Sequence, residues 1–343
     1  MFKTRKIVTV ILMVSFMAVL FAGCGGGKQE PAAPNAPAEP VKLVFKAGHV
    51  LAADHPYQKG LLKMDELLNE KTNGQIRLEV FPGSQLGGER ELCEGAQTGT
   101  VDLGLVTAPL ANFDQNWFIF DLPYLFDSKA HAYAFLDGPD GKAMLDGLAG
   151  KNIKGVAFFE TGFFNVFDNE RPLKTPDDVK GLTIRTMENQ AYLTYFKAMG
   201  ANPVPMAYGE IFTALQNNTI NGTLIPIASI YTSKFHEVAP YVSRTQNFYC
   251  PTTLIMSLAS WNKIPDDLKD EFMAAAEGGR DYMRQLLTDS ENEQIEKMKA
   301  EGAEVIEVDK NVWKNHASVK AVYDELVPAK VPQALVDKAK NAK

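Results

Sequence analysis

Two stretches of the sequence follow the same order of helix, tight turn and buried strand. Residues 91–105 and 210–224 carry Glu, Gln, Thr and Leu at matching positions, with similar residues at several others. Each stretch ends in an apolar run, which is typical of a strand in a buried parallel sheet. The repetition predicts two lobes of similar build. In such folds the ligand binds at the carboxyl ends of the strands, so we expect a cleft between the lobes.

Strand and helix patterns alternate over most of the chain, which indicates the α/β class. Expected strands are 42–47, 75–81, 101–106, 182–186, 202–206 and 220–224, and expected helices are 57–71, 89–96, 190–199 and 208–217. The last third is predicted to be mostly helical. A helix that begins near Trp261 runs to about Glu301, and a strand at 304–308 and a helix near 312–326 follow. The long helix exceeds one lobe and is expected to cross behind both.

The first forty residues have the features of an export signal and a tether. Three cations precede an apolar run at 7–21, which is shorter than the ~20 apolar residues that span a bilayer. Small residues before Cys24 resemble a lipobox, so residues 1–24 are expected to be a lipoprotein signal peptide with Cys24 lipidated. An uncleaved membrane anchor is the alternative. Residues 25–40, rich in Gly, Pro and Ala, predict a flexible tether. Both interpretations place the residues after 40 outside the cytoplasm, in the periplasm or at the outer face of the cytoplasmic membrane.

Composition limits the classes of function. The net charge is −7, and no basic cluster lies beyond the first residues, which argues against nucleic-acid binding. The apolar fraction of 45% is sufficient for real cores, and the length after the tether suggests two domains. Besides Cys24 there are Cys93, on a predicted helix, and Cys250, near a predicted strand start. We expect two buried free thiols, with a disulfide as the alternative.

Four segments, in order along the chain, carry a family resemblance. They are Asn73-Gly74-Gln75-Ile76 with residues 81–87 (FPGSQLG), residues 121–126 (DLPYLF), residues 176–185 (PDDVKGLTIR) and residues 200–216 (GANPVPMAYGEIFTALQ). Together they resemble the DctP-type solute-binding proteins of TRAP (tripartite ATP-independent periplasmic) transporters. The resemblance implies a two-lobe, periplasmic-binding-protein-like α/β fold, with crossing strands between the lobes and a long bracing helix.

The resemblance also implies how the chain is divided and what it does. Lobe I is expected at 41–162 plus about 251–290, and lobe II at about 163–250 plus 291–343. The lobes are expected to close on a small organic acid by a hinge motion. The protein then hands the acid to the membrane subunits of a TRAP permease, which an ion gradient drives. We expect a monomer without a cofactor or a metal.

Arg185 is the strongest candidate for ligand binding. It ends a predicted strand that should point into the cleft, and the resemblance implies that it clamps the ligand carboxylate. A guanidinium presents a planar fork that matches a carboxylate with two parallel hydrogen bonds. From the pattern alone, a surface arginine at a strand end would be the simpler interpretation.

Two further candidates follow from the resemblance. Tyr208 occupies a position where the family places an aromatic ring against the ligand, although it could instead pack on its own lobe. His49 lies in a loop after the first strand that faces the cleft in the family, and it is a weaker candidate for ligand contact.

Three polar positions of the sialic-acid branch of the family have changed in this sequence. A carboxylate of that branch is replaced by Thr107, and a second arginine by Phe164 or Asn165. An asparagine is replaced by Ile225. A buried polar ligand group that faces an apolar side chain loses its partner, at a cost of about 1–3 kcal/mol. The changes therefore favour a monocarboxylate with an apolar or aromatic body. A C4-dicarboxylate and a sugar acid are the alternatives.

Two other classes of function were weighed against transport. An extracytoplasmic enzyme is disfavoured because no pair of histidines has zinc-ligand spacing and no Gly-x-Ser-x-Gly elbow is present. Catalytic groups can also assemble from distant residues, so the absence of motifs does not decide the question. A ligand-sensing partner of a membrane receptor would share the fold and the site, and it remains open.

Overall fold

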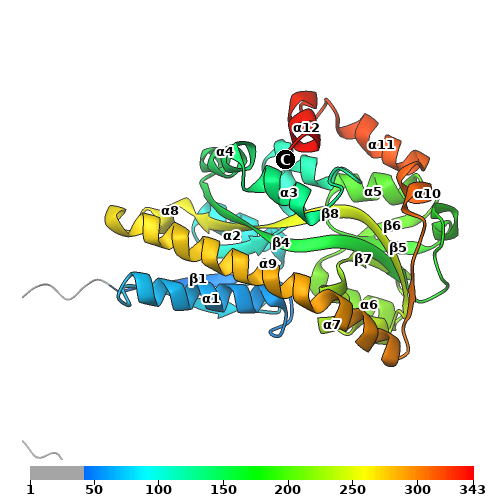
Figure 1. Cartoon of the computed structure of the whole chain (residues 1–343), viewed down its shortest axis with the longest axis horizontal. Helices are drawn as coiled ribbons and strands as arrows, with labels where there is room; N and C mark the ends of the chain where they lie inside the picture. Colours follow the sequence, from blue (N-terminus) through cyan, green and yellow to red (C-terminus); the bar gives the residue numbers. More distant parts are fainter. Residues whose placement is uncertain (1–41) are drawn as a thin grey trace, which may run out of the picture. The chain divides into compact units, whose positions relative to one another are not determined.

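Two long antiparallel strands run through the centre of the molecule in the computed structural model, which describes residues 42–343 (Figure 1). These strands, β4 (Ile153–Asp168) and β8 (Tyr241–Ser257), pair with one another along most of their length. Both are rich in aromatic and β-branched residues, which favour strands, and most of their residues are buried. The pairing is irregular at Gly162, whose φ of +104° suits glycine and bends the strand.

Two parallel groups of three strands flank this central pair. In residues 42–343 the strands form one nine-stranded sheet in the order β2-β1-β3-β8-β4-β7-β5-β6, and β9 pairs with β8. The other strands are β1 (Leu43–Gly48), β2 (Ile76–Phe81), β3 (Leu103–Val106), β5 (Thr183–Thr186), β6 (Asn202–Pro205), β7 (Gly222–Ile225) and β9 (Glu304–Ile306). The groups β2-β1-β3 and β6-β5-β7 repeat one strand order, so the predicted repetition is confirmed.

Helices cover the sheet and connect its parallel strands. They are α1 (Pro56–Lys71), α2 (Glu89–Thr98), α3 (Lys129–Leu136), α4 (Pro139–Gly147), α5 (Gln190–Lys197), α6 (Ile211–Gln216), α7 (Ile227–Thr232), α8 (Leu258–Trp261), α9 (Lys269–Ala300), α10 (Lys310–Lys314), α11 (Ala317–Leu326) and α12 (Gln333–Lys340). The long helix expected from near Trp261 begins later, at Lys269, because α8 ends at Trp261 and a 3-10 turn (Asp266–Leu268) follows Pro265. The helix expected near 312–326 is divided, and the His316 side chain caps the start of α11.

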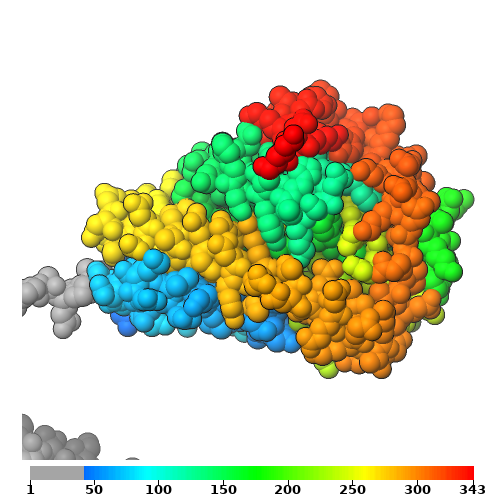
Figure 2. Space-filling view, viewed as in Figure 1, coloured from blue at the N-terminus to red at the C-terminus, as the bar shows by residue number. Residues whose placement is uncertain are grey.

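Helix α9 braces the fold as expected. It packs against α1, β4 and α7, which belong to different parts of the chain (Figure 1). Figure 2 shows it as a continuous ridge, yellow to orange, beside the blue α1. Helices α1 and α9 approach closely because Gly60 and Gly279 face one another, and a Cβ on Gly279 would lie 2.7 Å from the Gly60 carbonyl oxygen.

The predictions for the start of the chain, the lobe boundaries and the cysteines have different outcomes. The predicted signal peptide, Cys24 and the tether lie outside the described residues, and the proposed lobe boundaries stay a prediction. Cys93 and Cys250 are buried and unpaired, as expected, but Cys250 lies inside β8 rather than near a strand start. Among residues 42–343, the helices lack the length and apolar character needed to cross a bilayer.

Candidate functional site

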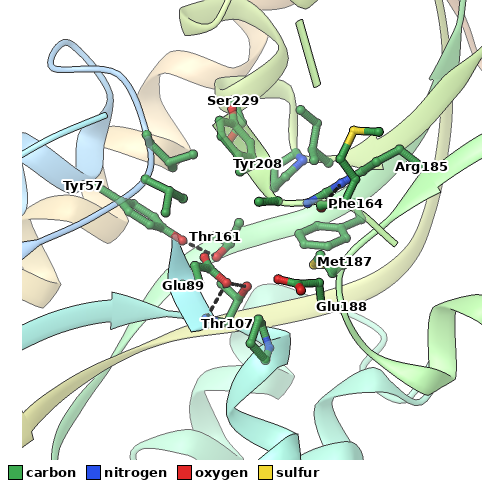
Figure 3. Close-up of a pocket in the computed structure, with 17 residues that line it drawn as sticks. Tyr57, Glu89, Thr107, Thr161, Phe164, Arg185, Met187, Glu188, Tyr208 and Ser229 are labelled. Atoms are coloured by element: carbon green, nitrogen blue, oxygen red, sulfur yellow. Dashed lines mark hydrogen bonds between the residues drawn. The ribbon is translucent and has the colours of Figure 1, made fainter. Parts of the chain in front are cut away.

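A pocket lies where the carboxyl ends of strands from the two parallel groups meet (Figure 3). Its walls come from the ends of β1, β3, β5, β6 and β7, and from α1, α2, β4 and α7. The pocket contains about 550 Å³ of space between side chains, part of it open to solvent. Only about 50 Å³ of this space can hold the centre of a water molecule, so the pocket is narrow in this conformation.

Arg185 on β5 places a guanidinium in this pocket. The side chain is only 3% exposed. Its Nε donates to the Met206 carbonyl oxygen over 2.9 Å, while its Nη1 has no hydrogen-bond partner within residues 42–343. Burial lowers the pKa of Arg185 to about 10, and the nearby charge of Glu89 opposes that shift. The group remains a cation at neutral pH and offers a fixed, unused donor to the pocket.

A half-buried carboxylate, that of Glu89, also lines this pocket. Glu89 is the first residue of α2, and its Oε2 accepts hydrogen bonds from the Thr107 backbone N (3.1 Å) and Oγ1 (2.5 Å). Burial raises the pKa of Glu89, whereas the two bonds from Thr107 and the charge of Arg185 lower it. Figure 3 shows the carboxylates of Glu89 and Glu188 on the side of the pocket away from Arg185. The pocket therefore has a cationic side and an acceptor side.

Apolar and hydroxyl groups complete the lining. Phe164 of β4 and Ile225 at the end of β7 contribute apolar surface. The Tyr208 ring packs edge-on to Phe235 with centroids 5.6 Å apart, and its hydroxyl lies 2.9 Å from Ser233 Oγ. Burial raises the pKa of the Tyr208 phenol, so it stays protonated and can donate. The pocket can thus contact both the carbon skeleton and the polar groups of a ligand.

The structure brings together most of the residues expected to bind the ligand. Five of the seven predicted ligand-binding residues line this pocket, and they are Arg185, Tyr208, Thr107, Phe164 and Ile225. The other two, Asn165 and His49, do not line it. Whether each lining residue contacts a ligand remains a prediction.

Asn165 and His49 have other contacts outside the lining of this pocket. Phe164 lines the pocket, whereas Asn165 lies at a register shift of the β4–β8 pairing and is outside the lining. The Asn165 amide nitrogen donates to the Phe163 carbonyl oxygen over 3.2 Å. His49 is buried beside α1, where its Nε2 lies 2.8 Å from Gln58 Oε1. Burial lowers the pKa of His49 to about 4, so it is neutral in its internal contact.

The sequence interpretation missed several lining residues, of which Glu89 and Glu188 matter most. Both follow recognisable signals: Glu89 opens a helix, and Glu188 comes directly after the strand end that carries Arg185. We found no group of three or more metal-ligating side chains within residues 42–343.

The geometry agrees with a match to a protein family. Residues 47–329 match the family model described as bacterial extracellular solute-binding protein, family 7 (DctP). The chain belongs to this family. These are TRAP solute-binding proteins, which bind small organic acids and deliver them to the subunits of a membrane permease. The DctP-type resemblance of the four sequence segments is confirmed, and so is the expected α/β, two-lobe fold class.

Individual relatives of this DctP protein differ in the acids named for them. The chain is 34% identical to the 2,3-diketo-L-gulonate-binding periplasmic protein YiaO of Escherichia coli, over 71% of this chain and 75% of the relative. A TRAP solute-binding protein from Bordetella bronchispeptica, whose bound density was interpreted as pantoate, is 35% identical with a TM-score of 0.84, covering 88% of this chain and 100% of that one. One from Polaromonas sp. JS666, bound to D-erythronate, is 33% identical with a TM-score of 0.85, covering 88% and 99%.

Proposed function

We propose that this protein captures a small hydroxy monocarboxylate outside the cytoplasm and delivers it to a TRAP permease. The observation that carries the proposal is the buried guanidinium of Arg185, whose Nη1 has no partner within the described chain. A ligand carboxylate would supply the missing acceptor and a counter-charge. Charge-assisted hydrogen bonds of this kind contribute about 1.5–3 kcal/mol each, a large share of the roughly −8 kcal/mol of a micromolar complex.

The acceptor side of the pocket favours hydroxyl groups on the rest of the ligand. A hydroxyl can donate to the Glu89 carboxylate, which Thr107 already holds in place. An aryl body, as considered from the sequence, would leave this carboxylate without a donor from the ligand, and that costs about 1–3 kcal/mol. Phe164 and Ile225 would then contact the carbon skeleton. Pantoate and D-erythronate, named for two similar proteins, are both hydroxy monocarboxylates.

A second carboxylate on the ligand is disfavoured by the same groups. At a separation of ~5 Å and an effective dielectric of ~20, two like charges repel by about 3 kcal/mol. The carboxylates of Glu89 and Glu188 both line the side away from Arg185, where the far end of a short dicarboxylate would lie. This repulsion supports a hydroxy monocarboxylate over a C4-dicarboxylate.

The proposal includes export and attachment to the membrane through a lipid on Cys24, and action as a monomer. Both rest on the sequence pattern and the family resemblance. A sensing partner of a membrane receptor is the alternative role for the same pocket. Growth on the bound acid, lost on deletion of the neighbouring permease genes, would favour transport over sensing.

A thermal-shift screen tests the proposed ligand class. We expect D-erythronate or pantoate, at about 100 times its dissociation constant, to stabilise residues 42–343 by ~2.7 kcal/mol and so raise the melting temperature by about 4 °C. Succinate and phenylacetate, a dicarboxylate and an aryl acid, should give smaller shifts. A larger shift with either of those would replace the proposed class, and the absence of any shift would count against acid binding. Proton NMR of the recovered acid tests for turnover, which a binding protein should not show.

A further inference from the structure

Behind the pocket, two of its lining segments meet through buried polar contacts. The β3 segment (residues 107–112) follows β3 and supplies Thr107 to the pocket, while the β5 segment (residues 187–189) follows β5 and supplies Glu188. The segments lie far apart in the sequence and carry adjoining parts of the wall, on the side that holds Glu89 and Glu188. Whatever joins them therefore sets how these two parts of the wall meet.

An exposed hydrogen bond from Asn112 Nδ2 to the Glu188 carbonyl oxygen (2.9 Å) joins the segments at the surface. Asn189 makes the buried part of the junction, and its side-chain amide is fully used. Its Oδ1 caps α5 by accepting from the Ala191 backbone N over 2.9 Å. Its Nδ2 donates to the Ala108 carbonyl oxygen (3.0 Å) in the β3 segment and to Asp121 Oδ2 (2.6 Å). These contacts fix the orientation of the amide, because exchanging its oxygen and nitrogen would break every one of them.

Asp121 is the buried anchor of this junction. It belongs to one of the sequence segments that carry the family resemblance, and its side chain is 1% exposed. Besides Asn189, its Oδ1 accepts from the Tyr192 hydroxyl over 2.7 Å. Within residues 42–343 it forms no ion pair, and the titratable groups that face it are Tyr192 of α5 and Cys250 of β8. A carboxylate at this position is held by neutral donors alone.

We propose that Asp121 is a positioning residue for acid binding, which acts through Asn189 to hold the β5 segment against the β3 segment. The inference deepens the proposed function and rests on it, since the positioned walls are those of the acid pocket. The contact itself does not depend on which acid binds. It also gives the DLPYLF segment a physical role in the site, although none of its residues lines the pocket.

Burial of Asp121 makes the junction sensitive to pH. Burial raises its pKa to about 7, and it also raises the pKa values of Tyr192 and Cys250, which stay neutral. When the segments separate, water reaches Asp121 and its pKa returns toward ~3.9. The joined state therefore holds a proton more tightly than the separated state. By linkage, the junction is most stable at low pH, and its stability falls as the pH rises from about 4 to about 7.

Hydrogen exchange of the exported protein, purified without added ligand, tests the contact directly. The probes are the Leu110 and Asn189 amides, which are hydrogen-bonded within the two segments. Asn189→Ser keeps an oxygen to cap α5 but removes the two buried hydrogen bonds that Asn189 Nδ2 donates, and it leaves the exposed bond from Asn112 to the Glu188 carbonyl oxygen. We expect it to speed exchange at both amides by about tenfold or more. After correction for intrinsic rates, wild-type exchange at these amides should rise by at least about tenfold between pH 5 and pH 8.

Two variants provide the controls. In Asp121→Asn, the side-chain oxygen can still accept from Asn189 while its NH₂ donates to Tyr192 Oη, so protection should stay within about threefold of wild type at pH 6 and should not vary with pH. Thr72→Val removes a buried hydroxyl that donates to the Leu68 carbonyl oxygen and accepts from the Ile76 N, far from the junction. It should speed exchange at Ile76 and leave Leu110 and Asn189 unchanged.

The outcomes separate this inference from the proposed function. Unchanged exchange at both amides in Asn189→Ser, or a pH dependence that persists in Asp121→Asn, would overturn it. If Asn189→Ser does not fold, the pH profile of Asp121→Asn decides alone. With D-erythronate as the probe, we expect about tenfold weaker affinity in Asn189→Ser and near wild-type affinity in Asp121→Asn at pH 6. Failure of D-erythronate to bind the wild type counts against the proposed function, while the exchange data still judge the junction.

Discussion

Replacing Arg185 with methionine is expected to abolish acid binding while leaving the ligand-free protein at least as stable as the wild type. Two charge-assisted bonds lost to a carboxylate predict an affinity at least about 100-fold weaker. The stability effect has the opposite sign because burial lowers the pKa of Arg185 below its ordinary value. A buried cation with a lowered pKa destabilises the folded state at every pH below that pKa, and methionine removes this cost. Calorimetric titration with D-erythronate and urea unfolding without ligand measure the two effects.

A second arginine, Arg171, serves as the control that distinguishes a loss of ligand binding from a general loss of stability. Arg171 lies outside the pocket and donates to the carbonyl oxygens of Asp178 and Lys180. Arg171→Met should lower the free energy of unfolding by about 1–3 kcal/mol and leave the affinity unchanged. Arg185→Lys keeps the charge but loses the planar fork, so it should still weaken binding by about tenfold or more. Undiminished affinity in Arg185→Met would remove this residue from the site.

Glu89→Gln is expected to change which acids bind. The amide keeps the shape of the side chain and an oxygen for Thr107, but it removes one negative charge from the side of the pocket away from Arg185. Even partial relief of the ~3 kcal/mol of repulsion predicts that succinate binds at least about tenfold more tightly. D-erythronate should bind about tenfold more weakly, because its hydroxyl loses a charged acceptor. Parallel titrations of the wild type and the variant with both acids give the change in selectivity.

Glu91→Gln is the control for this change. Glu91 stands in the same turn of α2 but is exposed and does not line the pocket. Its replacement removes the same charge from the same helix, so the ratio of the two affinities should stay within about twofold of wild type if the effect of Glu89 is local. An equal change of selectivity in both variants would mean that the overall field, rather than contact with Glu89, sets the preference.

Local patterns predicted the parallel parts of the fold well. The strand around Phe45 and the helix that contains Leu61 lie where their hydrophobic spacing indicates, because each has one more deeply buried face. The long strands β4 and β8 were not predicted as elements, although the family resemblance implied crossing strands. Their aromatic runs show no single period, since both of their faces are buried.

The sequence pattern places some lining residues at strand ends, but the family resemblance was needed to single them out. Arg185 and Ile225 fall at strand ends that face the pocket, although the pattern alone favoured a surface position for Arg185. Glu89 enters the pocket because Thr107, from another element, holds its carboxylate. The junction of Asp121 with Asn189 likewise joins residues far apart in sequence. Contacts of this kind have no periodic signal in one sequence.

A crystal structure of the protein with bound D-erythronate tests the central claim most directly. The account predicts that the carboxylate of the acid lies within hydrogen-bond distance of Arg185 Nη1, with at least one hydroxyl donating to Glu89. A carboxylate bound elsewhere, with the Arg185 guanidinium still unpaired, would contradict the proposed mode of binding.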